Sequence, residues 1–359
     1  MNRTLVTCAL SLLLAPSVAT PAPITTLYVV GDSLSDQGNA YLLTGGTFPP
    51  APYAQRASNG PVAVERLADA LGVTLTPSET GGTNYAVLGA ATGLVTIAGT
   101  SPPVQTDNLA AIQYGQPALA GTSLQSQALA LLEAGPMANP SCSLVFVWGG
   151  ANDFFLNPSA VTAAAGVGNV FGVVTTLYAG GARNFLVPNL PDLSMTPSGL
   201  ALSPAQRAGL QALTLGFNNG LRSALDSAST LPGITITQFD TFDFFNLMLA
   251  NPTAFGFTNT STPCLAGNLA GGGVVCNDPN AYIFWDSVHP TTAAHRALGD
   301  AFAQAVVPEP TVLTFALVSA SAWLLRSRRR GARAPTSALS ERTRPAEEHL
   351  HLSGPGLPS

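Results

Sequence analysis

The feature that most constrains the fold is a regular alternation of strand-like and helix-like segments through the body of the chain. Short apolar runs typical of strands lie at 25–31, 84–90, 143–150, 184–190 and 234–240. Stretches typical of helices lie at 60–72, 123–135, 160–180, 203–230 and 291–306. Several apolar runs are continuous, as expected for strands covered by helices on both faces. The alternation predicts one α/β domain over residues 24–307, with a parallel sheet.

The charge of this body argues against one class of function. The 359-residue chain contains no lysine, and between Ile24 and Val307 six arginines stand against fifteen acids, a net charge of −9. A nucleic-acid-binding domain needs a basic face to neutralise phosphates. We therefore expect no nucleic-acid partner.

The first residues, 1–22, are typical of a secretory signal peptide. Arg3 precedes an apolar run at 5–15, and small residues suited to cleavage after Ala19 or Ala22 follow it. The run is too short to span a membrane, and a buried first helix is the alternative. The pattern predicts export across the inner membrane.

The other end of the chain carries a second signal, at 308–330. The tripeptide Pro308-Glu309-Pro310 precedes an apolar run at 311–325 and then a cluster of arginines. This order resembles the PEP-CTERM sorting signal of Gram-negative bacteria, which implies removal by an exosortase-type enzyme. The apolar run would hold a precursor transiently in the inner membrane, and the processed protein would be extracellular or at the cell surface. A plain C-terminal membrane anchor is the alternative, and residues 331–359 are expected to be a disordered polar tail.

Three cysteines remain after the signal peptide. Cys264 and Cys276 flank a glycine-rich loop, and in an exported protein they are expected to form a disulfide. Cys142 stands just before an apolar run and is expected to be a buried, inert thiol.

A cluster of short polar side chains follows the first strand-like run, in the sequence LYVVGDSLSDQGN at 27–39. Such residues are typical of a turn or a helix cap, and Ser33, Ser35 or Asp36 could serve there. Open α/β sheets, however, bind their ligands beyond the carboxyl ends of the strands. Ser33 is therefore also a candidate nucleophile.

A histidine is the usual base for a serine nucleophile, and the body holds only His289 and His295. Asp286 stands three residues before His289, close enough for one turn to present both side chains on one side. A carboxylate that accepts from one imidazole nitrogen leaves the other free to take a proton. Cap and surface-turn positions are the structural alternatives for this pair. His295 falls inside the last helix-like stretch and is expected to be structural.

Two further candidates lie where predicted strands end. The amide of Gly89, in the run at 84–90, has no side chain in its way, and Asn152, after the run at 143–150, offers a side-chain NH₂. An acyl transfer needs such donors for the oxyanion. A strand-end turn and a helix cap are the alternatives. Because the carboxyl ends of parallel strands meet along one edge, we expect both to lie near Ser33.

These motifs, in this order, resemble the four-part signature of the GDSL (SGNH) hydrolases. They are GDSLSDQGN at 31–39, Gly89, GAND at 150–153 and DSVHP at 286–290. The similarity covers about 25–305. It implies the SGNH hydrolase fold, a three-layer α/β/α sandwich with a flavodoxin-like parallel sheet, and ester hydrolysis without metal or cofactor.

Carried onto this sequence, the resemblance implies that Ser33 is the nucleophile, His289 the base and Asp286 the residue that orients it. The amides of Ser33 and Gly89 and the side chain of Asn152 would form the oxyanion hole. The hypothesis is a secreted carboxyl-ester hydrolase that forms an acyl-enzyme on a small-molecule, lipid or acylated-polysaccharide ester. Neutral esters with short acyl chains are expected first. An acyltransferase or polysaccharide O-acetylesterase of the same fold, or a non-catalytic surface or matrix protein, is the alternative.

Overall fold

The computed structural model describes residues 23–307. The expected signal peptide, sorting segment and polar tail, at 1–22, 308–330 and 331–359, lie outside the described residues.

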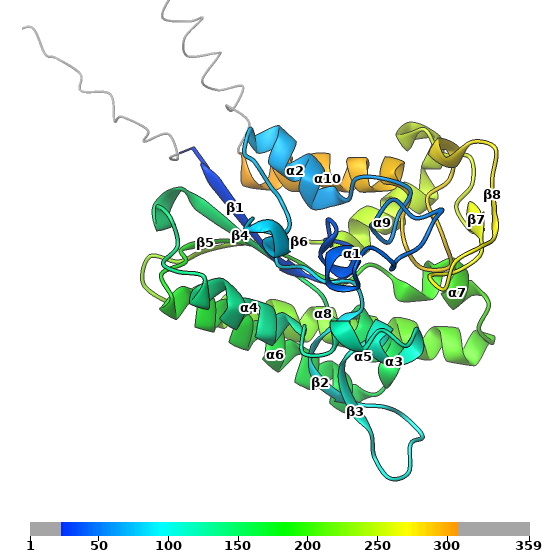
Figure 1. Cartoon of the computed structure of the whole chain (residues 1–359), viewed down its shortest axis with the longest axis horizontal. Helices are drawn as coiled ribbons and strands as arrows, with labels where there is room; N and C mark the ends of the chain where they lie inside the picture. The colour runs from blue at the N-terminus through cyan, green and yellow to red at the C-terminus, as the bar shows by residue number, and fades with distance from the viewer. Residues whose placement is uncertain (1–22, 308–359) are drawn as a thin grey trace, which may run out of the picture. The chain divides into compact units, whose positions relative to one another are not determined.

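A four-stranded parallel sheet forms the centre of the domain (Figure 1). Its spatial order is β1-β4-β5-β6, and each neighbouring pair is parallel. The strands are β1 (Thr26–Gly31), β4 (Ser143–Trp148), β5 (Asn184–Pro188) and β6 (Thr235–Phe239). Four of the five predicted strands are therefore confirmed.

The fifth predicted strand, at 84–90, is not a regular strand. The segment runs along the free edge of β1, where the Tyr85 amide donates to the Val29 carbonyl at 2.8 Å and the Val87 amide donates to Gly31 at 3.2 Å. On its outer side the Asn39 side chain donates to the carbonyls of Asn84 and Ala86, so a side chain stands where a further strand would pair. With this segment counted as the second strand, the order is the flavodoxin-like 2-1-3-4-5.

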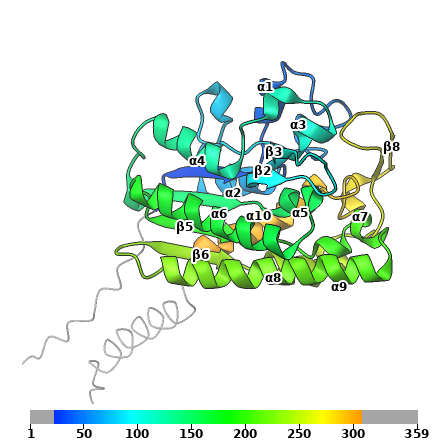
Figure 2. The ribbon, with the colours of Figure 1, turned by 90° about the horizontal axis from the view of Figure 1, so that it is seen from below.

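Helices cover both faces of the sheet (Figures 1 and 2). One face carries α2 (Ala63–Leu71), α9 (Thr241–Ala250) and α10 (Thr292–Val306). The other carries α4 (Leu124–Glu133), α6 (Ala160–Ala179) and α8 (Pro204–Ala228). Five of these six helices match predicted stretches, and α9 was not predicted. The result is the three-layer α/β/α fold expected from the sequence.

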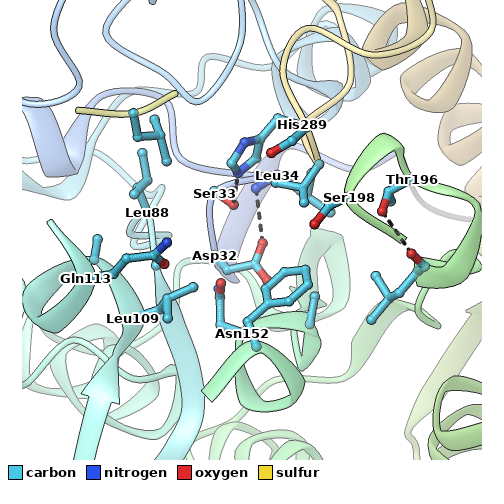
Figure 3. Close-up of a pocket in the computed structure, with 18 of the residues that line it drawn as sticks. Asp32, Ser33, Leu34, Leu88, Leu109, Gln113, Asn152, Thr196, Ser198 and His289 are labelled. Atoms are coloured by element: carbon cyan, nitrogen blue, oxygen red, sulfur yellow. Dashed lines mark hydrogen bonds between the residues drawn. The ribbon is translucent and has the colours of Figure 1, made fainter. Parts of the chain in front are cut away.

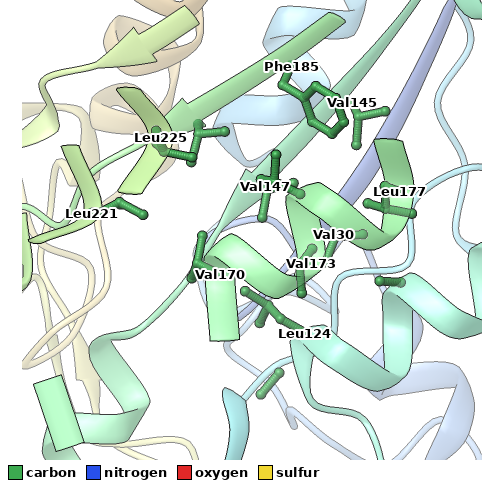
Figure 4. Close-up of a cluster of buried hydrophobic side chains, with 14 of the residues drawn as sticks. Val30, Leu124, Val145, Val147, Val170, Val173, Leu177, Phe185, Leu221 and Leu225 are labelled. Atoms are coloured by element: carbon green, nitrogen blue, oxygen red, sulfur yellow. The ribbon is translucent and has the colours of Figure 1, made fainter. Parts of the chain in front are cut away.

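Strand side chains alternate between the two helical layers and build two apolar cores. On β4, Val145 and Val147 pack toward α4, α6 and α8 (Figure 4), whereas Leu144, Phe146 and Trp148 pack toward α2, α9 and α10. All six residues of β4 are buried. A fully buried strand explains the continuous apolar run in the sequence.

The remaining elements are short and lie mostly around the carboxyl ends of the strands. The hairpin strands are β2 (Ala90–Thr96), β3 (Gln105–Asn108), β7 (Leu265–Ala266) and β8 (Val274–Val275). The short α-helices are α1 (Asn39–Leu43), α3 (Leu109–Gln113), α5 (Ala151–Leu156) and α7 (Pro197–Leu200). Single 3₁₀ turns lie at Ser78–Thr80, Pro117–Leu119, Pro140–Cys142, Leu193–Met195, Pro252–Phe255 and Pro279–Ala281.

Among the described residues, α6 is the one helix long and apolar enough to cross a membrane. One side of it, including Val170, Val173 and Leu177, is buried in the core beneath the sheet (Figure 4). Packing within the domain therefore accounts for part of its apolar character, since 39% of its apolar window is buried.

Of the two predictions about the cysteines, one is confirmed and one is wrong. Cys264 and Cys276 form the expected disulfide, which closes the loop carrying β7 and β8. The expectation of a buried Cys142 is wrong, because this free thiol is partly exposed. Cys142 ends a 3₁₀ turn at the amino-terminal end of the sheet, one residue before β4 enters the core.

Candidate active site

Ser33 lies in the turn that follows β1, and the polar residues around it hold that turn. The Asp36 carboxylate accepts from the amides of Gly38 and Asn39, both at 2.7 Å, and so caps the start of α1. It also accepts from the Leu88 amide at 2.8 Å, which fastens the turn to the 84–90 segment. The polar cluster of the sequence therefore serves both purposes considered for it: Asp36 caps the helix and Ser33 faces the pocket (Figure 3).

The three residues expected to form a triad are hydrogen-bonded in series. The His289 Nε2 atom lies 3.0 Å from the Ser33 hydroxyl oxygen (Figure 3). On the other side of the ring, Nδ1 lies 2.8 Å from Asp286 Oδ2 and 3.0 Å from Oδ1. Ser33 is 256 residues from His289 along the chain, so the fold alone brings them together.

A tight turn presents Asp286 and His289 on one side, as their spacing predicts. Asp286 Oδ1 accepts from the backbone amides of Val288 at 2.9 Å and His289 at 2.8 Å, which fixes the carboxylate. Thr291 then caps α10 by accepting from the Ala294 amide at 3.2 Å. The pair is therefore held between a braced turn and a helix start.

The charges of this pair support one another. Burial raises the pKa of Asp286, but His289 and the backbone donors together lower it by a larger amount, so the pKa lies below its ordinary value. Burial lowers the pKa of His289, but the Asp286 carboxylate raises it more, so it lies above 6.5. Asp286 is thus anionic, and it stabilises the imidazolium that forms when His289 takes a proton.

The expected oxyanion donors line the same pocket as Ser33. Gly89 has a φ of +82°, and a Cβ there would lie 2.7 Å from the Ala110 amide nitrogen, so only glycine fits. Among the described residues, no acceptor takes a hydrogen bond from the Ser33 or Gly89 amide. Asn152, in the first turn of α5, donates to the Ala90 carbonyl at 2.9 Å, which uses one of its two N–H groups and orients the other.

His295 lies outside this group, as expected of a structural residue. It is buried on α10, and its Nδ1 accepts from the Ala63 amide of the neighbouring α2 at 3.2 Å. Burial lowers the pKa of His295 to about 3, so the ring stays neutral at ordinary pH.

Two buried acids beside the site were not singled out from the sequence. Asp32 lines the pocket and accepts from the Leu34 amide at 3.0 Å (Figure 3), and burial raises its pKa to about 7. Asp153 accepts from the amide and hydroxyl of Thr92, and burial raises its pKa to about 6. Both stand within the GDSL and GAND motifs, but nothing in those short strings marks them as buried.

Tyr53 is a further neighbour that the sequence did not indicate. Its hydroxyl donates to Asp286 Oδ2 at 2.7 Å, from a loop 233 residues away. No periodicity or spacing connects the two positions in the sequence.

The pocket in front of Ser33 has a volume of about 440 Å³, within the range of small-molecule sites. Its walls are mainly apolar and come from the turn after β1, the 84–90 segment, α3, α5 and the chain after β5. They include Leu34, Leu88, Leu109, Ile112, Phe155 and Leu193. Within residues 23–307, no group of three or more His, Cys, Asp or Glu side chains is arranged to hold a metal ion.

Comparisons with known proteins identify the family of the chain. The profile of the family described as GDSL-like lipase/acylhydrolase matches residues 27–302. A GDSL esterase/lipase of Arabidopsis thaliana is 35% identical over 133 residues, which cover 34% of this chain and 37% of that protein. An uncharacterized Pseudomonas putida protein is 30% identical over 337 residues, which cover 85% of this chain and 52% of that protein.

The chain thus spans about half or less of the length of these two relatives. A solved structure of a lipolytic G-D-S-L family member from Veillonella parvula is 12% identical, covers 79% of this chain and 97% of that one, and has a TM-score of 0.41. Since the family profile covers more than half of the sequence, including every candidate site residue, the chain belongs to the GDSL-like lipase/acylhydrolase family.

Proposed function

We propose that this protein hydrolyses carboxylic esters through an acyl-enzyme on Ser33. The observation that carries the proposal is the hydrogen-bonded series Ser33–His289–Asp286, which opens onto an apolar pocket. The name of the Arabidopsis relative, an esterase/lipase, supports the same chemistry.

In the proposed first half-reaction, the Ser33 hydroxyl oxygen attacks the ester carbonyl carbon while His289 Nε2 takes the hydroxyl proton. The tetrahedral intermediate carries a negative oxygen, which accepts from the Ser33 and Gly89 amides and the free N–H of Asn152. Collapse of the intermediate breaks the bond to the alcohol oxygen, and His289 gives that oxygen its proton. The alcohol leaves and the acyl group remains on Ser33.

In the second half-reaction, water takes the place of the alcohol. The water oxygen attacks the acyl carbon while His289 accepts a proton from that water. The amides of Ser33 and Gly89 and the side chain of Asn152 hold the second oxyanion. Collapse releases the carboxylic acid and returns the proton to Ser33. Asp286 stays anionic throughout and keeps the imidazole oriented.

The pocket supports a neutral substrate with an apolar acyl part. Its apolar walls include several leucine, isoleucine and phenylalanine side chains, and two acids, Asp32 and Asp192, also line it. An anionic polymer would meet an acidic body, and an apolar acyl group would contact the leucine, isoleucine and phenylalanine side chains of these walls. We therefore favour a small or lipid-like ester over an acylated polysaccharide, with short acyl chains turned over first.

We also propose that the protein acts outside the cytoplasm. The disulfide between Cys264 and Cys276 supports an oxidising compartment. The export and sorting segments are sequence features outside the described residues. Recovery of the protein from the extracellular fraction tests its location. Mass spectrometry of that form tests the processing of the sorting segment: cleavage near Pro308-Glu309-Pro310 is expected, and a mature chain that still ends at Ser359 would contradict it.

A panel of p-nitrophenyl esters from acetyl to palmitoyl tests the proposed activity. The purified protein should hydrolyse the short esters fastest, and acetylated xylan should be a poor substrate. A rate that climbs steadily toward palmitoyl would contradict the chain-length proposal. Absence of turnover on every ester would contradict the function itself.

A further inference from the structure

We infer that Tyr53 is a positioning residue of the catalytic machinery, which acts through its hydrogen bond to Asp286. The inference rests on the proposed ester hydrolysis and adds a fourth residue to the series Ser33–His289–Asp286. Within the described residues, Tyr53 makes no hydrogen bond to the nucleophile or the base, and its hydroxyl bonds Asp286 instead.

The contact is short, buried and charge-assisted. The Tyr53 hydroxyl donates to Asp286 Oδ2 at 2.7 Å, on the same oxygen that lies 2.8 Å from His289 Nδ1. Tyr53 is 5% exposed and Asp286 3%. Burial raises the pKa of Tyr53 above its ordinary value, so the phenol keeps its proton and can only be the donor toward the carboxylate. A donor on an anion in a buried site is among the stronger hydrogen bonds in proteins.

With Tyr53 included, both carboxylate oxygens of Asp286 are held. Oδ1 accepts from the backbone amides of Val288 and His289, whereas Oδ2 would have only the imidazole. The phenol therefore fixes the one oxygen that the turn itself leaves free. This limits rotation of the carboxylate about its terminal torsion, which is soft in aspartate.

The loop that carries Tyr53, here called the 53–59 loop, is fastened to the catalytic segment at two more points. The Ser58 hydroxyl donates to the Pro290 carbonyl at 2.9 Å, and Asn59 accepts from the Thr292 amide at 2.8 Å. These contacts lie directly after His289. The loop therefore follows the Asp286–His289 turn along its length rather than meeting it at one chance contact.

The ring of Tyr53 is itself held in place. It packs edge-on against Trp285, with ring centroids 6.2 Å apart, in an apolar cluster that also contains Phe48, Leu119 and Leu269. Trp285 immediately precedes Asp286, and its amide donates to the His289 carbonyl at 2.7 Å. One aromatic contact thus couples the ring to the same turn that its hydroxyl touches.

The variant Tyr53→Phe removes the hydroxyl and keeps the ring. The hydroxyl of Tyr53 partly neutralises the negative charge of Asp286. Without it, the carboxylate attracts the imidazolium more strongly, so the pKa of His289 should rise. The carboxylate also loses its fixed orientation, so kcat should fall on the order of tenfold while KM changes little. The charge of Asp32 also raises the pKa of His289, and Tyr114 and His295 are the titratable neighbours whose own pKa values respond to Asp286 and His289; the variant leaves all three in place.

Tyr178→Phe is the matched control. Its hydroxyl donates to the Pro232 carbonyl at 2.9 Å, away from the pocket, so the variant loses one hydrogen bond without touching Asp286. It should keep the wild-type kcat and the wild-type pKa of His289. If Tyr53 were purely structural, Tyr53→Phe would match this control after kcat is corrected for the folded fraction of each variant.

A double-mutant cycle tests whether Tyr53 acts through Asp286. In an Asp286→Asn background the carboxylate charge is gone, so Tyr53→Phe should cost less than about twofold in kcat. An equal loss in both backgrounds would overturn the inference.

A second measurement applies if Tyr53→Phe does not fold. Replacement of tyrosine by 3-fluorotyrosine strengthens the phenol as a donor and should lower the pKa of His289. An unchanged pKa would overturn the inference.

The closing experiment is an NMR titration of the histidine rings of the full chain, wild type against Tyr53→Phe and Tyr178→Phe. The inference predicts a higher pKa of His289 in Tyr53→Phe only. An unchanged pKa together with a kcat within twofold of the control would refute it. Because this titration needs no turnover, an inactive wild type would count against the proposed ester hydrolysis and leave the test of Tyr53 intact.

Discussion

Replacement of Gly89 by alanine should damage both stability and catalysis, for reasons that the structure separates. Gly89 has a φ of +82°, in the left-handed region that alanine avoids. An added Cβ would lie 2.6 Å from Asn108 Oδ1, 2.7 Å from the Ala110 amide nitrogen and 2.8 Å from the Ala110 Cβ. Two of these three atoms belong to α3 and cannot swing away, because α3 packs as a wall of the pocket.

The magnitude follows from two costs. Holding alanine at positive φ costs about 1–2 kcal/mol. Forcing a methyl group against fixed neighbours costs about 1–3 kcal/mol more. The free energy of unfolding should therefore fall by about 2–5 kcal/mol. Relief of the clash moves the Gly89 amide, so the lost oxyanion donor should lower kcat by about 10²–10³.

Gly72→Ala is the matched control for this test. Gly72 ends α2 with a φ of +68°, and no atom lies within 4 Å of its added Cβ. It should lose only the about 1–2 kcal/mol of backbone strain and keep kcat. Urea unfolding and p-nitrophenyl acetate turnover measure both quantities on both variants. If Gly89→Ala unfolds like Gly72→Ala and keeps kcat within threefold of wild type, the amide of Gly89 is not an oxyanion donor.

Three further outcomes are expected. Asn152→Ala should lower kcat by about 10²–10³ with a smaller change in KM, and an effect on KM alone would remove Asn152 from the oxyanion hole. Because burial lowers the pKa of His289 but Asp286 raises it more, kcat/KM should fall as the pH drops through a value above 6.5; an acidic limb centred below 6.5 would argue against this pair. The Cys264–Cys276 bridge spans a sequence separation of 12 and should stabilise the protein by about 3 kcal/mol. The Leu265 amide, next to Cys264, donates to the carbonyl of Trp285 at 2.6 Å, and Trp285 precedes Asp286. Reduction of the bridge should therefore lower activity before circular dichroism reports global unfolding. Iodoacetamide-reactive thiols at these two positions in the unreduced native protein would show that the bridge does not exist.

Much of the layered fold could be predicted from the sequence because both faces of the sheet are buried. The residues of β4 are all buried, so its apolar run in the sequence is unbroken. The edge segment at 84–90 shows the same pattern in the sequence, yet only its side toward β1 pairs with a strand, because the Asn39 side chain takes the carbonyls on its outer side. Whether an apolar run pairs as a regular strand depends on such distant partners. The helix α9 was not predicted for a different reason: its apolar residues show no clear helical periodicity, and the segment that follows it is rich in loops.

The candidate site was predictable to the extent that its residues stand in compact motifs. Ser33, Gly89 and Asn152 stand at or just after predicted strand ends, whereas Asp286 and His289 stand just before the last predicted helix. The structure brings all five together. Contacts made only by the tertiary fold gave no signal. The hydroxyl of Tyr53 and the carboxylate it meets are 233 residues apart.

Turnover by single and double variants of the proposed nucleophile and base tests the central claim most directly. Ser33→Ala and His289→Ala should each lower kcat on p-nitrophenyl acetate by on the order of 10⁴-fold or more, and the double variant should be little worse, because the two residues act as a unit. His295→Asn keeps an acceptor near the Ala63 amide and serves as the histidine control, with a kcat near wild type. If His289→Ala keeps its activity while His295→Asn loses it, the base has been assigned to the wrong residue and the proposed mechanism fails.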